Sequence, residues 1–110
     1  MSNDNSNNTP IIYEVNISVD EDVSQQYVDW LYHHVDEILK TVPGFTHASV
    51  FERFAHEEPA TSSSSSVKQR LYTSHYYVKT REDLENYFKN YAPAFRQDGL
   101  NRFPGKFTAA

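Results

Sequence analysis

The chain has 110 residues, a formal net charge of −5 and no cysteine. Its length suits a single domain, and an acidic balance without a basic stripe argues against nucleic acid and anionic membrane surfaces as partners. The absence of cysteine excludes disulfides, thiolate metal ligands and a cysteine nucleophile, and no signal peptide or membrane-spanning run is readable, so we expect a soluble cytoplasmic protein.

Residues 1–10 form an Asn/Ser-rich tail with too few apolar residues to order itself, so we predict disorder there. A single domain is predicted over residues 11–110. It opens with IIYEVNISV, in which apolar and polar residues alternate as in a strand with one buried face. The residues of that face are Tyr13, Val15, Ile17 and Val19.

A helix is predicted to follow this strand. Asp20 is placed to cap its start, and Glu21 and Asp22 bring negative charge to its first turn. Pro43 and Gly44 are placed to end it. Its apolar positions recur at spacings of three and four, which gives the helix one apolar face. These positions are Val23, Tyr27, Leu31, His34, Ile38 and Val42.

Two further strands are predicted at residues 45–54 and 67–80, the second of which is rich in Tyr, Val and Thr. Between them lies AHEEPATSSSSS, residues 55–66, a polar stretch that ends in a serine run. Such a run has nothing to bury, so we expect a flexible connecting loop.

A second helix is predicted after the third strand. Thr80 and Asp83 resemble a capping box at its start, with Asp in place of the usual Glu. Pro93 is placed to begin a further turn that closes near Gly99. A short last strand is predicted at about residues 106–109. The apolar stripe of this second helix comprises Leu84, Tyr87, Phe88 and Tyr91.

The predicted order of elements is β-α-β-β-α-β, which is typical of the ferredoxin-like fold. We therefore predict an α+β domain with a four-stranded antiparallel sheet and two helices on one face. The other face would be uncovered, and an uncovered face with large apolar groups more often marks an interface than a bare surface. We expect a homodimer in which two such faces meet. The uncovered face is predicted to carry Ile12, Glu14, Asn16, Ser18, Phe45, His47, Phe51, Leu71, His75 and Tyr77.

On the opposite face of the sheet, toward the helices, we predict the side chains of the alternate residues of each strand. This assignment depends on the strand register, because a slip of one residue exchanges the two faces. In the second and third strands the helix-facing residues are predicted to be Ala48, Val50, Tyr72, Tyr76 and Val78.

Two adjacent histidines lie within the first predicted helix. On a helical wheel His34 falls inside the apolar stripe, whereas His33 points toward solvent with Asp29 and near Glu37. Adjacent helix residues do not share a face, so the two histidines cannot readily bind one ion. His33 and Glu37 would together supply only two metal ligands. His34 is either a core residue hydrogen-bonded to a tyrosine or a backbone carbonyl, or a residue that lines a pocket.

A second pair of histidines, His47 and His75, is predicted on the uncovered face. If the second and third strands form a hairpin, these two could lie nearly opposite each other and, with Glu14, bind a metal. The long loop between the strands leaves their register open. The sequence has no phosphate-binding glycine loop, no nucleophile elbow and no HExxH motif. We predict no metal site and no cofactor.

Three stretches of the chain resemble a known family. They are IIYEVNISVDED, the segment from His34 to Leu39 with Gly44 and Phe45, and REDLENYFKNYAPAFR followed by NRFPGKF. Together they span nearly all of residues 11–107. The family is a small, mostly bacterial family of a domain of unknown function, placed in the dimeric α/β-barrel (ferredoxin-like) superfamily. The resemblance implies a homodimer, but it implies no activity because the family has none assigned.

The chain departs from this family's pattern at two places. Family members typically read His-Ile-Pro at the end of the first helix, whereas here His34 is followed by Val35 and Asp36. They often read His-Ala-Pro after the second helix, whereas here Tyr91 takes the place of the histidine. His34 is therefore the family histidine that carries over.

The resemblance also implies where a ligand would lie. The wider superfamily includes cofactor-independent monooxygenases and isomerases, and in several members the ligand lies between the sheet and the helices. We therefore predict a pocket for a small apolar or aromatic molecule, lined by Tyr27, Trp30, His34 and Tyr76. One alternative is an enzyme of the monooxygenase or isomerase kind that uses His34 as an acid or base. A second alternative is a structural dimerisation domain without a ligand.

Overall fold

The structure is a computed structural model that describes residues 9–54 and 68–110. The predicted loop at residues 55–66 lies outside the described residues, as do residues 1–8 of the predicted tail.

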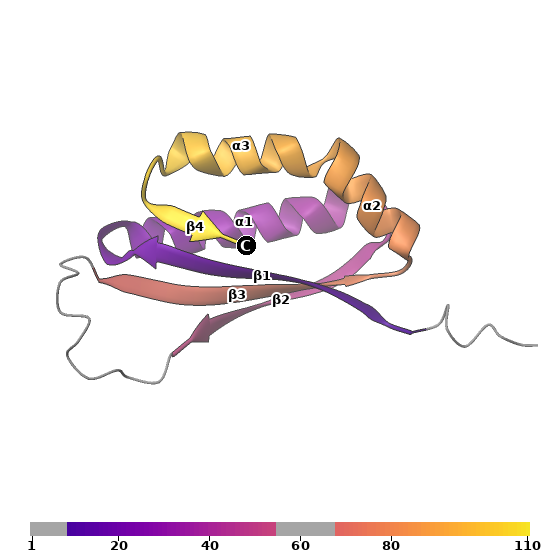
Figure 1. Cartoon of the computed structure of the whole chain (residues 1–110), viewed down its shortest axis with the longest axis horizontal. Helices are drawn as coiled ribbons and strands as arrows, with labels where there is room; N and C mark the ends of the chain where they lie inside the picture. Colours follow the sequence, from indigo (N-terminus) through magenta and orange to yellow (C-terminus); the bar gives the residue numbers. More distant parts are fainter. Residues whose placement is uncertain (1–8, 55–67) are drawn as a thin grey trace, which may run out of the picture.

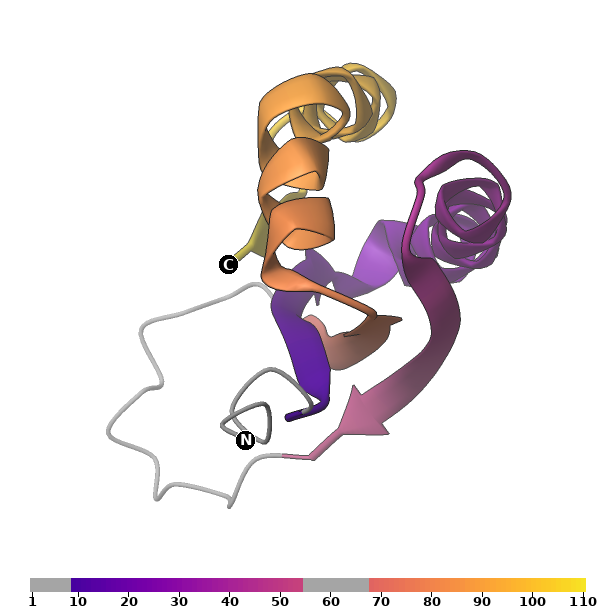
Figure 2. The same ribbon diagram turned by 90° about the vertical axis from the view of Figure 1, so that its right-hand side faces the viewer.

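The described residues form one sheet with its helices packed on one side (Figure 1). The strands pair antiparallel in the order β2-β3-β1-β4, and Figure 2 shows the other side of the sheet without helices. This confirms the ferredoxin-like βαββαβ fold, although the second helix is divided into α2 and α3. In chain order the elements are β1 (Ile11–Asp20), the 3-10 helix η2 (Glu21–Val23), α1 (Ser24–Thr41), β2 (Phe45–Arg53), β3 (Gln69–Val78), α2 (Arg81–Asn90), α3 (Ala92–Arg102) and β4 (Phe107–Ala109).

The core lies between α1 and the inner face of the sheet. The buried residues of α1 recur at spacings of three and four, as the sequence pattern predicts, and Val35 lies among them. His34 is only half-buried, so it falls at the edge of this stripe, where its ring meets Phe95 of α3. The buried apolar residues of α1 and of the two central strands are Tyr27, Leu31, Val35, Ile38, Ile17, Val19, Tyr72, Tyr76 and Val78.

The start of α1 differs from the prediction. Asp20 makes no side-chain cap, because it ends β1 and its Oδ1 accepts a hydrogen bond from Gln69 Nε2 at 3.0 Å. Gln69 lies directly opposite Asp20 in the β1–β3 register, so the cross-strand partner takes the carboxylate. The chain enters the helix through η2, where Ser24 Oγ donates to the Glu21 carbonyl oxygen at 3.0 Å.

The predicted end of the first helix and the predicted start of the second agree with the structure. Helix α1 ends at Thr41, just before Pro43 and Gly44, and the φ of 85° at Gly44 is one that glycine adopts without strain. At the start of α2, the backbone N–H of Asp83 donates to Thr80 Oγ1 at 3.0 Å. Thr80 is therefore a true N-cap.

The first residue of β2 faces the core and not the uncovered side. Phe45 is 4% exposed, which contradicts the prediction that it lies outside. The cause is a register shift between Phe45 and His47, where β2 carries one extra residue relative to β3. A bulge of this kind reverses the alternation, so Phe45 and Ala48 both face inward while His47 faces outward.

Helix α3 is longer than predicted. It continues through Gly99 to Arg102, so Gly99 does not close a short turn. A Cβ on Gly99 would lie 3.2 Å from Trp30 and 3.3 Å from Phe107, which is tighter than ordinary van der Waals contact. The glycine is therefore explained by the close approach of two rings to the helix rather than by a helix end.

The uncovered side of the sheet, which we call the outer face, is partly apolar. Ile12, Phe51 and Tyr77 are 42%, 47% and 41% exposed on it. Polar groups lie among them, including His75, whose Nε2 is 2.8 Å from Glu14 Oε1. Such a mixed surface with large apolar groups is typical of a protein interface.

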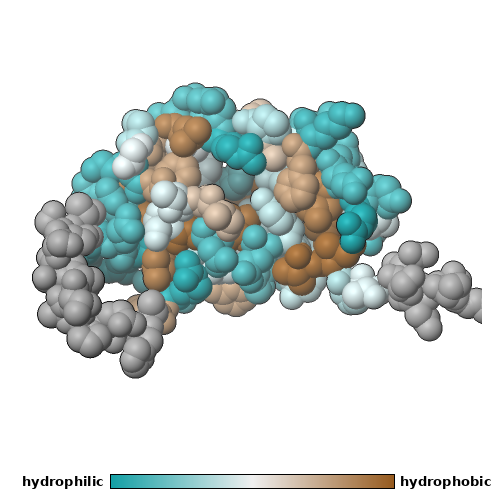
Figure 3. Space-filling view, viewed as in Figure 1, coloured by the Kyte–Doolittle hydropathy of each residue, from teal (hydrophilic) through white to brown (hydrophobic). Residues whose placement is uncertain are grey.

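The helix layer does not seal the whole inner face. Figure 3 shows hydrophobic side chains at the surface where β1 passes beneath α2. Phe88 of α2 is 44% exposed and packs edge-on against Tyr13 of β1, with ring centres 5.1 Å apart.

None of the helices in the described part of the chain is long and apolar enough to span a membrane.

Candidate functional site

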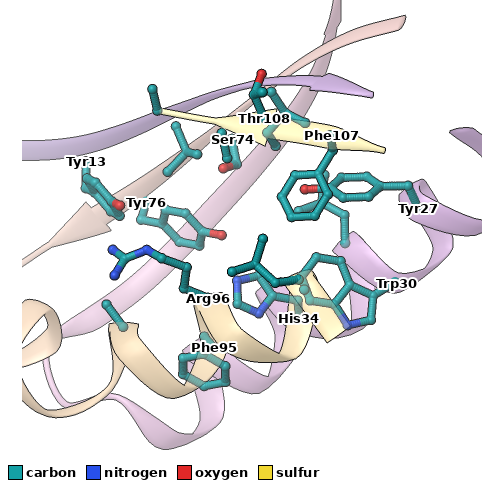
Figure 4. A pocket seen from close by; sticks show the side chains of 18 of the residues that line it. Tyr13, Tyr27, Trp30, His34, Ser74, Tyr76, Phe95, Arg96, Phe107 and Thr108 are labelled. Carbon is teal, nitrogen blue, oxygen red and sulfur yellow. The ribbon is translucent and has the colours of Figure 1, made fainter. Parts of the chain in front are cut away.

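A cavity of about 450 Å³ lies between the inner face of the sheet and helices α1 and α3 (Figure 4). This volume is within the range of small-molecule sites in proteins. Aromatic rings from both layers line it, together with aliphatic and small side chains. The four residues that the sequence analysis placed in a pocket all line this cavity; they are Tyr27, Trp30, His34 and Tyr76.

The helix side of the cavity is formed by rings at consecutive turns of α1. Tyr27, Trp30 and His34 are three and four residues apart, so their side chains project from one side of the helix. The rings of Trp30 and His34 stack, with centres 4.8 Å apart and planes 11° from parallel. Phe95 of α3 meets the His34 ring edge-on at 5.0 Å. These contacts hold the imidazole between two aromatic side chains.

His34 is uncharged at neutral pH. Burial lowers the pKa of His34 to about 4, because desolvation disfavours the imidazolium, and the nearby Asp98 carboxylate only partly opposes this effect. No hydrogen bond to His34 is found among the described residues, so the predicted bond to a tyrosine or a backbone carbonyl is not seen there. His34 is thus a ring in the wall of the cavity rather than a hydrogen-bonded core residue.

Asp98 fixes the orientation of the Trp30 indole. Trp30 Nε1 donates to Asp98 Oδ2 at 3.1 Å, and Arg102 Nε donates to the other carboxylate oxygen at 3.0 Å. Partial desolvation acts to raise the pKa of Asp98, but the hydrogen bonds from Arg102 and Trp30 outweigh it and hold the pKa below its usual value. The carboxylate therefore stays ionised and anchors the indole from α3.

Four tyrosines supply hydroxyl groups to the cavity. Burial raises the pKa of each above its ordinary value, and that of Tyr76 to about 12. All four therefore keep their hydrogen at neutral pH and can donate as well as accept hydrogen bonds. These residues, on β1, α1, β3 and α2 respectively, are Tyr13, Tyr27, Tyr76 and Tyr87.

Ser74 adds a further polar group on the sheet side of the cavity. It is 1% exposed and lies on β3 two residues before Tyr76, on the same face. The Ser74 hydroxyl lies close enough to the Tyr76 hydroxyl to act against the rise of the Tyr76 pKa that burial causes. The two hydroxyls nevertheless make no hydrogen bond of acceptable geometry, and Ser74 Oγ has no partner among the described residues. A buried hydroxyl without a partner is costly unless a water or a ligand satisfies it.

Arg96 is the charged side chain of the cavity that the sequence analysis did not identify. Arg96 is exposed to solvent as well as lining the cavity, and Figure 4 shows its guanidinium beside the hydroxyl of Tyr13. Burial raises the pKa of Tyr13 and of Tyr87, and the charge of Arg96 acts in the opposite direction on both. The sequence predicted only a short turn in this region and not helix α3. The helical spacing that brings Arg96 and Gly99 to the same side therefore could not be used to predict Arg96 as a cavity residue.

The other histidines do not form a metal site in the described part of the chain. His33 is exposed, as predicted, and its Nδ1 lies 2.8 Å from the Asp29 carbonyl oxygen. His47 lies opposite Tyr77 and not opposite His75, which the β2–β3 register places two residues away against Ser49. Within residues 9–54 and 68–110, no three His, Cys, Asp or Glu side chains gather as metal ligands.

Solved structures of other proteins share this architecture at low sequence identity. An ethyl tert-butyl ether D (EthD) family protein from Bacillus halodurans superposes with a TM-score of 0.56 at 12% identity, covering 91% of this chain and 95% of its own. SnoaB, a cofactor-independent oxygenase from Streptomyces nogalater, gives 0.55 at 10% identity over 90% and 85%. A dimeric ferredoxin-like protein of unknown function from Jannaschia gives 0.50 at 9% identity over 91% and 96%. At these identities the likeness establishes the fold alone.

Fold and cavity together define a ferredoxin-like α+β domain with a pocket between its sheet and helices that aromatic rings line in part. Residues 10–110 match the family described as "Domain of unknown function (DUF4286)", and the chain belongs to this family. The family resemblance drawn from the sequence is thereby confirmed. No curated protein matches the sequence.

Proposed function

We propose that this protein binds a small apolar or aromatic molecule in the cavity between its sheet and helices, and that it does so as a homodimer. The observation that supports the proposal is the cavity of about 450 Å³, whose wall joins aromatic rings to a few polar groups. Ligand sites typically have this composition, because apolar surface provides affinity and sparse polar groups provide orientation. A purely structural dimerisation domain has no need of such a space.

The shape of the wall favours a ligand with a flat ring. Trp30 and His34 already stack on each other, and Phe95 meets His34 edge-on, so the wall contains a cluster of rings in favourable contact. A bound aromatic ring can complete such a cluster through offset stacking or edge contacts, which add to the free energy of burial. Trp30 cannot swing out of the wall easily, since Asp98 holds its Nε1.

A fluorescence titration tests this proposal. Trp30 is the single tryptophan of the chain and lines the cavity, so its emission reports directly on occupancy. Phenylacetamide, an uncharged aromatic probe, is expected to change the Trp30 emission in a saturable way. Isothermal calorimetry on the same samples gives an independent affinity.

Two matched variants locate the binding event. Val15 of β1 and Val50 of β2 both lie beside Ser74 of β3, on opposite sides of it, and only Val15 lines the cavity. We expect Val15→Phe, which fills cavity space, to weaken phenylacetamide binding roughly tenfold or more, whereas Val50→Phe leaves it nearly unchanged. Equal effects of the two variants, or no binding by the parent protein, would contradict the proposal.

A rival proposal makes His34 an acid or base in an enzyme of the monooxygenase or isomerase kind. Its support is that the His34 imidazole lines the cavity, is neutral, and has no hydrogen-bond partner among the described residues. Against it, a pKa of about 4 leaves no proton to donate near neutral pH and makes the imidazole a weak base. Turnover of a bound molecule that His34→Ala abolishes, with the fold retained, would favour the rival.

The homodimer is supported by the outer face. Its exposed apolar side chains, Ile12, Phe51 and Tyr77, lie on a sheet surface that none of the described helices covers. Burying them against a second copy would remove this apolar surface from water, which is the main driving force of association. The cavity opens on the other side of the sheet, so dimerisation through this face would leave it accessible.

A further inference from the structure

We propose that the ligand of this cavity is a monoanion, a small aromatic or apolar carboxylic acid whose carboxylate pairs with Arg96. The inference rests on the proposed binding function and adds the chemical class of the ligand. It follows from the charge of the cavity wall, from the free donors within it, and from the position of one guanidinium.

Arg96 lacks a partner where a neighbouring arginine has one. Arg102 lies on the same helix and donates to Asp98 at 3.0 Å. Arg96 is exposed to solvent where it lines the cavity, and it makes no ion pair and no hydrogen bond among the described residues (Figure 4). A guanidinium offers several donors in a fixed plane that match the two oxygens of a carboxylate.

No acidic side chain of the described residues lies in the cavity wall. Within residues 9–54 and 68–110 the lining contains neither Asp nor Glu, and His34 is neutral, so Arg96 is the single charged side chain found there. The chain as a whole carries a formal charge of −5, so this positive side chain differs from the general balance of the protein. An anionic ligand would balance that charge without removing another protein contact.

Hydroxyl donors line the same cavity. The Tyr13 hydroxyl lies beside the guanidinium in Figure 4, whereas the Tyr76 hydroxyl points away from it, and both tyrosines keep their hydrogens. The Ser74 hydroxyl is buried without a partner among the described residues. A carboxylate accepts hydrogen bonds at both oxygens, so it can accept from Arg96 and Tyr13 at once. A single guanidinium matches one negative charge, which favours a carboxylate over a doubly charged phosphate ester. The aromatic and aliphatic side chains of the wall favour a ligand whose remaining part is apolar.

Phenylacetate and phenylacetamide test this inference because they share a ring and differ in one charge. Each is titrated against the parent protein and two variants, with Trp30 emission as the readout. Arg96→Gln removes the charge in the cavity. Arg81→Gln is the matched control, since Arg81 is an exposed arginine at the start of α2 outside the cavity wall.

We expect the parent to bind phenylacetate more tightly than phenylacetamide. Arg96→Gln should weaken phenylacetate binding roughly tenfold to a hundredfold, as the loss of a charge-assisted hydrogen bond predicts, and leave phenylacetamide within about twofold. Arg81→Gln should change neither affinity. Added salt should weaken the binding of phenylacetate and not of the amide.

Three results would overturn the inference, and they separate it from the proposed function. Equal affinities for the two probes in the parent would leave a binding cavity without selectivity for an anion. An equal loss for both probes in Arg96→Gln would make Arg96 a packing residue only. If neither probe bound to the parent, the inference and the proposed function would fail together.

Discussion

His34 gives this protein a stability that depends on pH. The pKa of His34 is 6.5 in the unfolded chain and about 4 in the folded one, so between these values the unfolded chain binds a proton that the folded chain does not. The free energy of unfolding should therefore fall as the pH falls. From about pH 7 to about pH 5 we expect a loss of about 2 kcal/mol from this group, measured by urea unfolding.

His34→Leu isolates the contribution of this imidazole. Because leucine does not titrate, the variant should lose less stability over the same pH range than the parent. His33→Leu, at the exposed neighbouring position, should keep the pH dependence of the parent. If all three proteins respond alike to pH, His34 is not desolvated as the structure indicates.

The residues of the cavity could be predicted from the sequence to different degrees. Tyr27, Trp30 and His34 share one helix, so their spacing alone places them together. Ser74 and Arg96 come from separate elements that meet only in the folded chain, and neither is unusual in its local context. Ser74 in particular reads as an ordinary strand residue until its burial and its missing partner are known.

At the scale of the element, the start of α2 depends on a single hydroxyl. Thr80 Oγ1 accepts the hydrogen bond of the Asp83 N–H, which otherwise has no partner within the helix. We expect Thr80→Ala to lower the free energy of unfolding by about 1 kcal/mol, and Thr80→Ser to retain most of it. Chemical denaturation measures both.

The same substitution elsewhere serves as the control. Thr41 lies in the last turn of α1, and its hydroxyl donates to the Glu37 carbonyl oxygen of its own helix at 2.7 Å. Thr41→Ala should cost nothing or stabilise slightly, because alanine is the better helix former. A loss at Thr41 as large as that at Thr80 would show that the cap is not the cause.

The order of the elements could be predicted because each element carries a signal in its own consecutive residues. The errors concern features of the structure that depend on contacts between residues far apart in the sequence. Alternation in β1 and the stripe of α1 are properties of consecutive residues. The bulge that turns Phe45 inward depends on how β2 pairs with β3, which no local pattern reveals. Gly99 looks like a helix end until Trp30 and Phe107 are seen to pack against it.

At the scale of the whole molecule, the outer face is expected to hold two copies together. Phe51 on this face and Phe88 on α2 are exposed to similar extents, 47% and 44%. Phe51→Glu would bury a charge between the two sheets, so we expect the dissociation constant of the dimer to rise at least about tenfold. Phe88→Glu places the same charge on the helix layer and should leave the oligomeric state unchanged.

Light scattering during size-exclusion chromatography measures this difference across a range of protein concentrations. The parent and Phe88→Glu should elute as dimers under conditions in which Phe51→Glu is largely monomeric. A parent protein that is monomeric at every concentration would contradict the proposed assembly, as would two variants that dissociate equally.

The measurement that tests the binding cavity most directly is a titration of the isotope-labelled protein with phenylacetamide, followed through its amide NMR signals. The three glycines provide a built-in comparison, because Gly99 lines the cavity whereas Gly44 and Gly105 do not. We predict a saturable shift of the Gly99 signal, with those of Gly44 and Gly105 nearly unchanged. A Gly99 signal that does not move, or three glycine signals that move alike, would show that the cavity does not bind the probe.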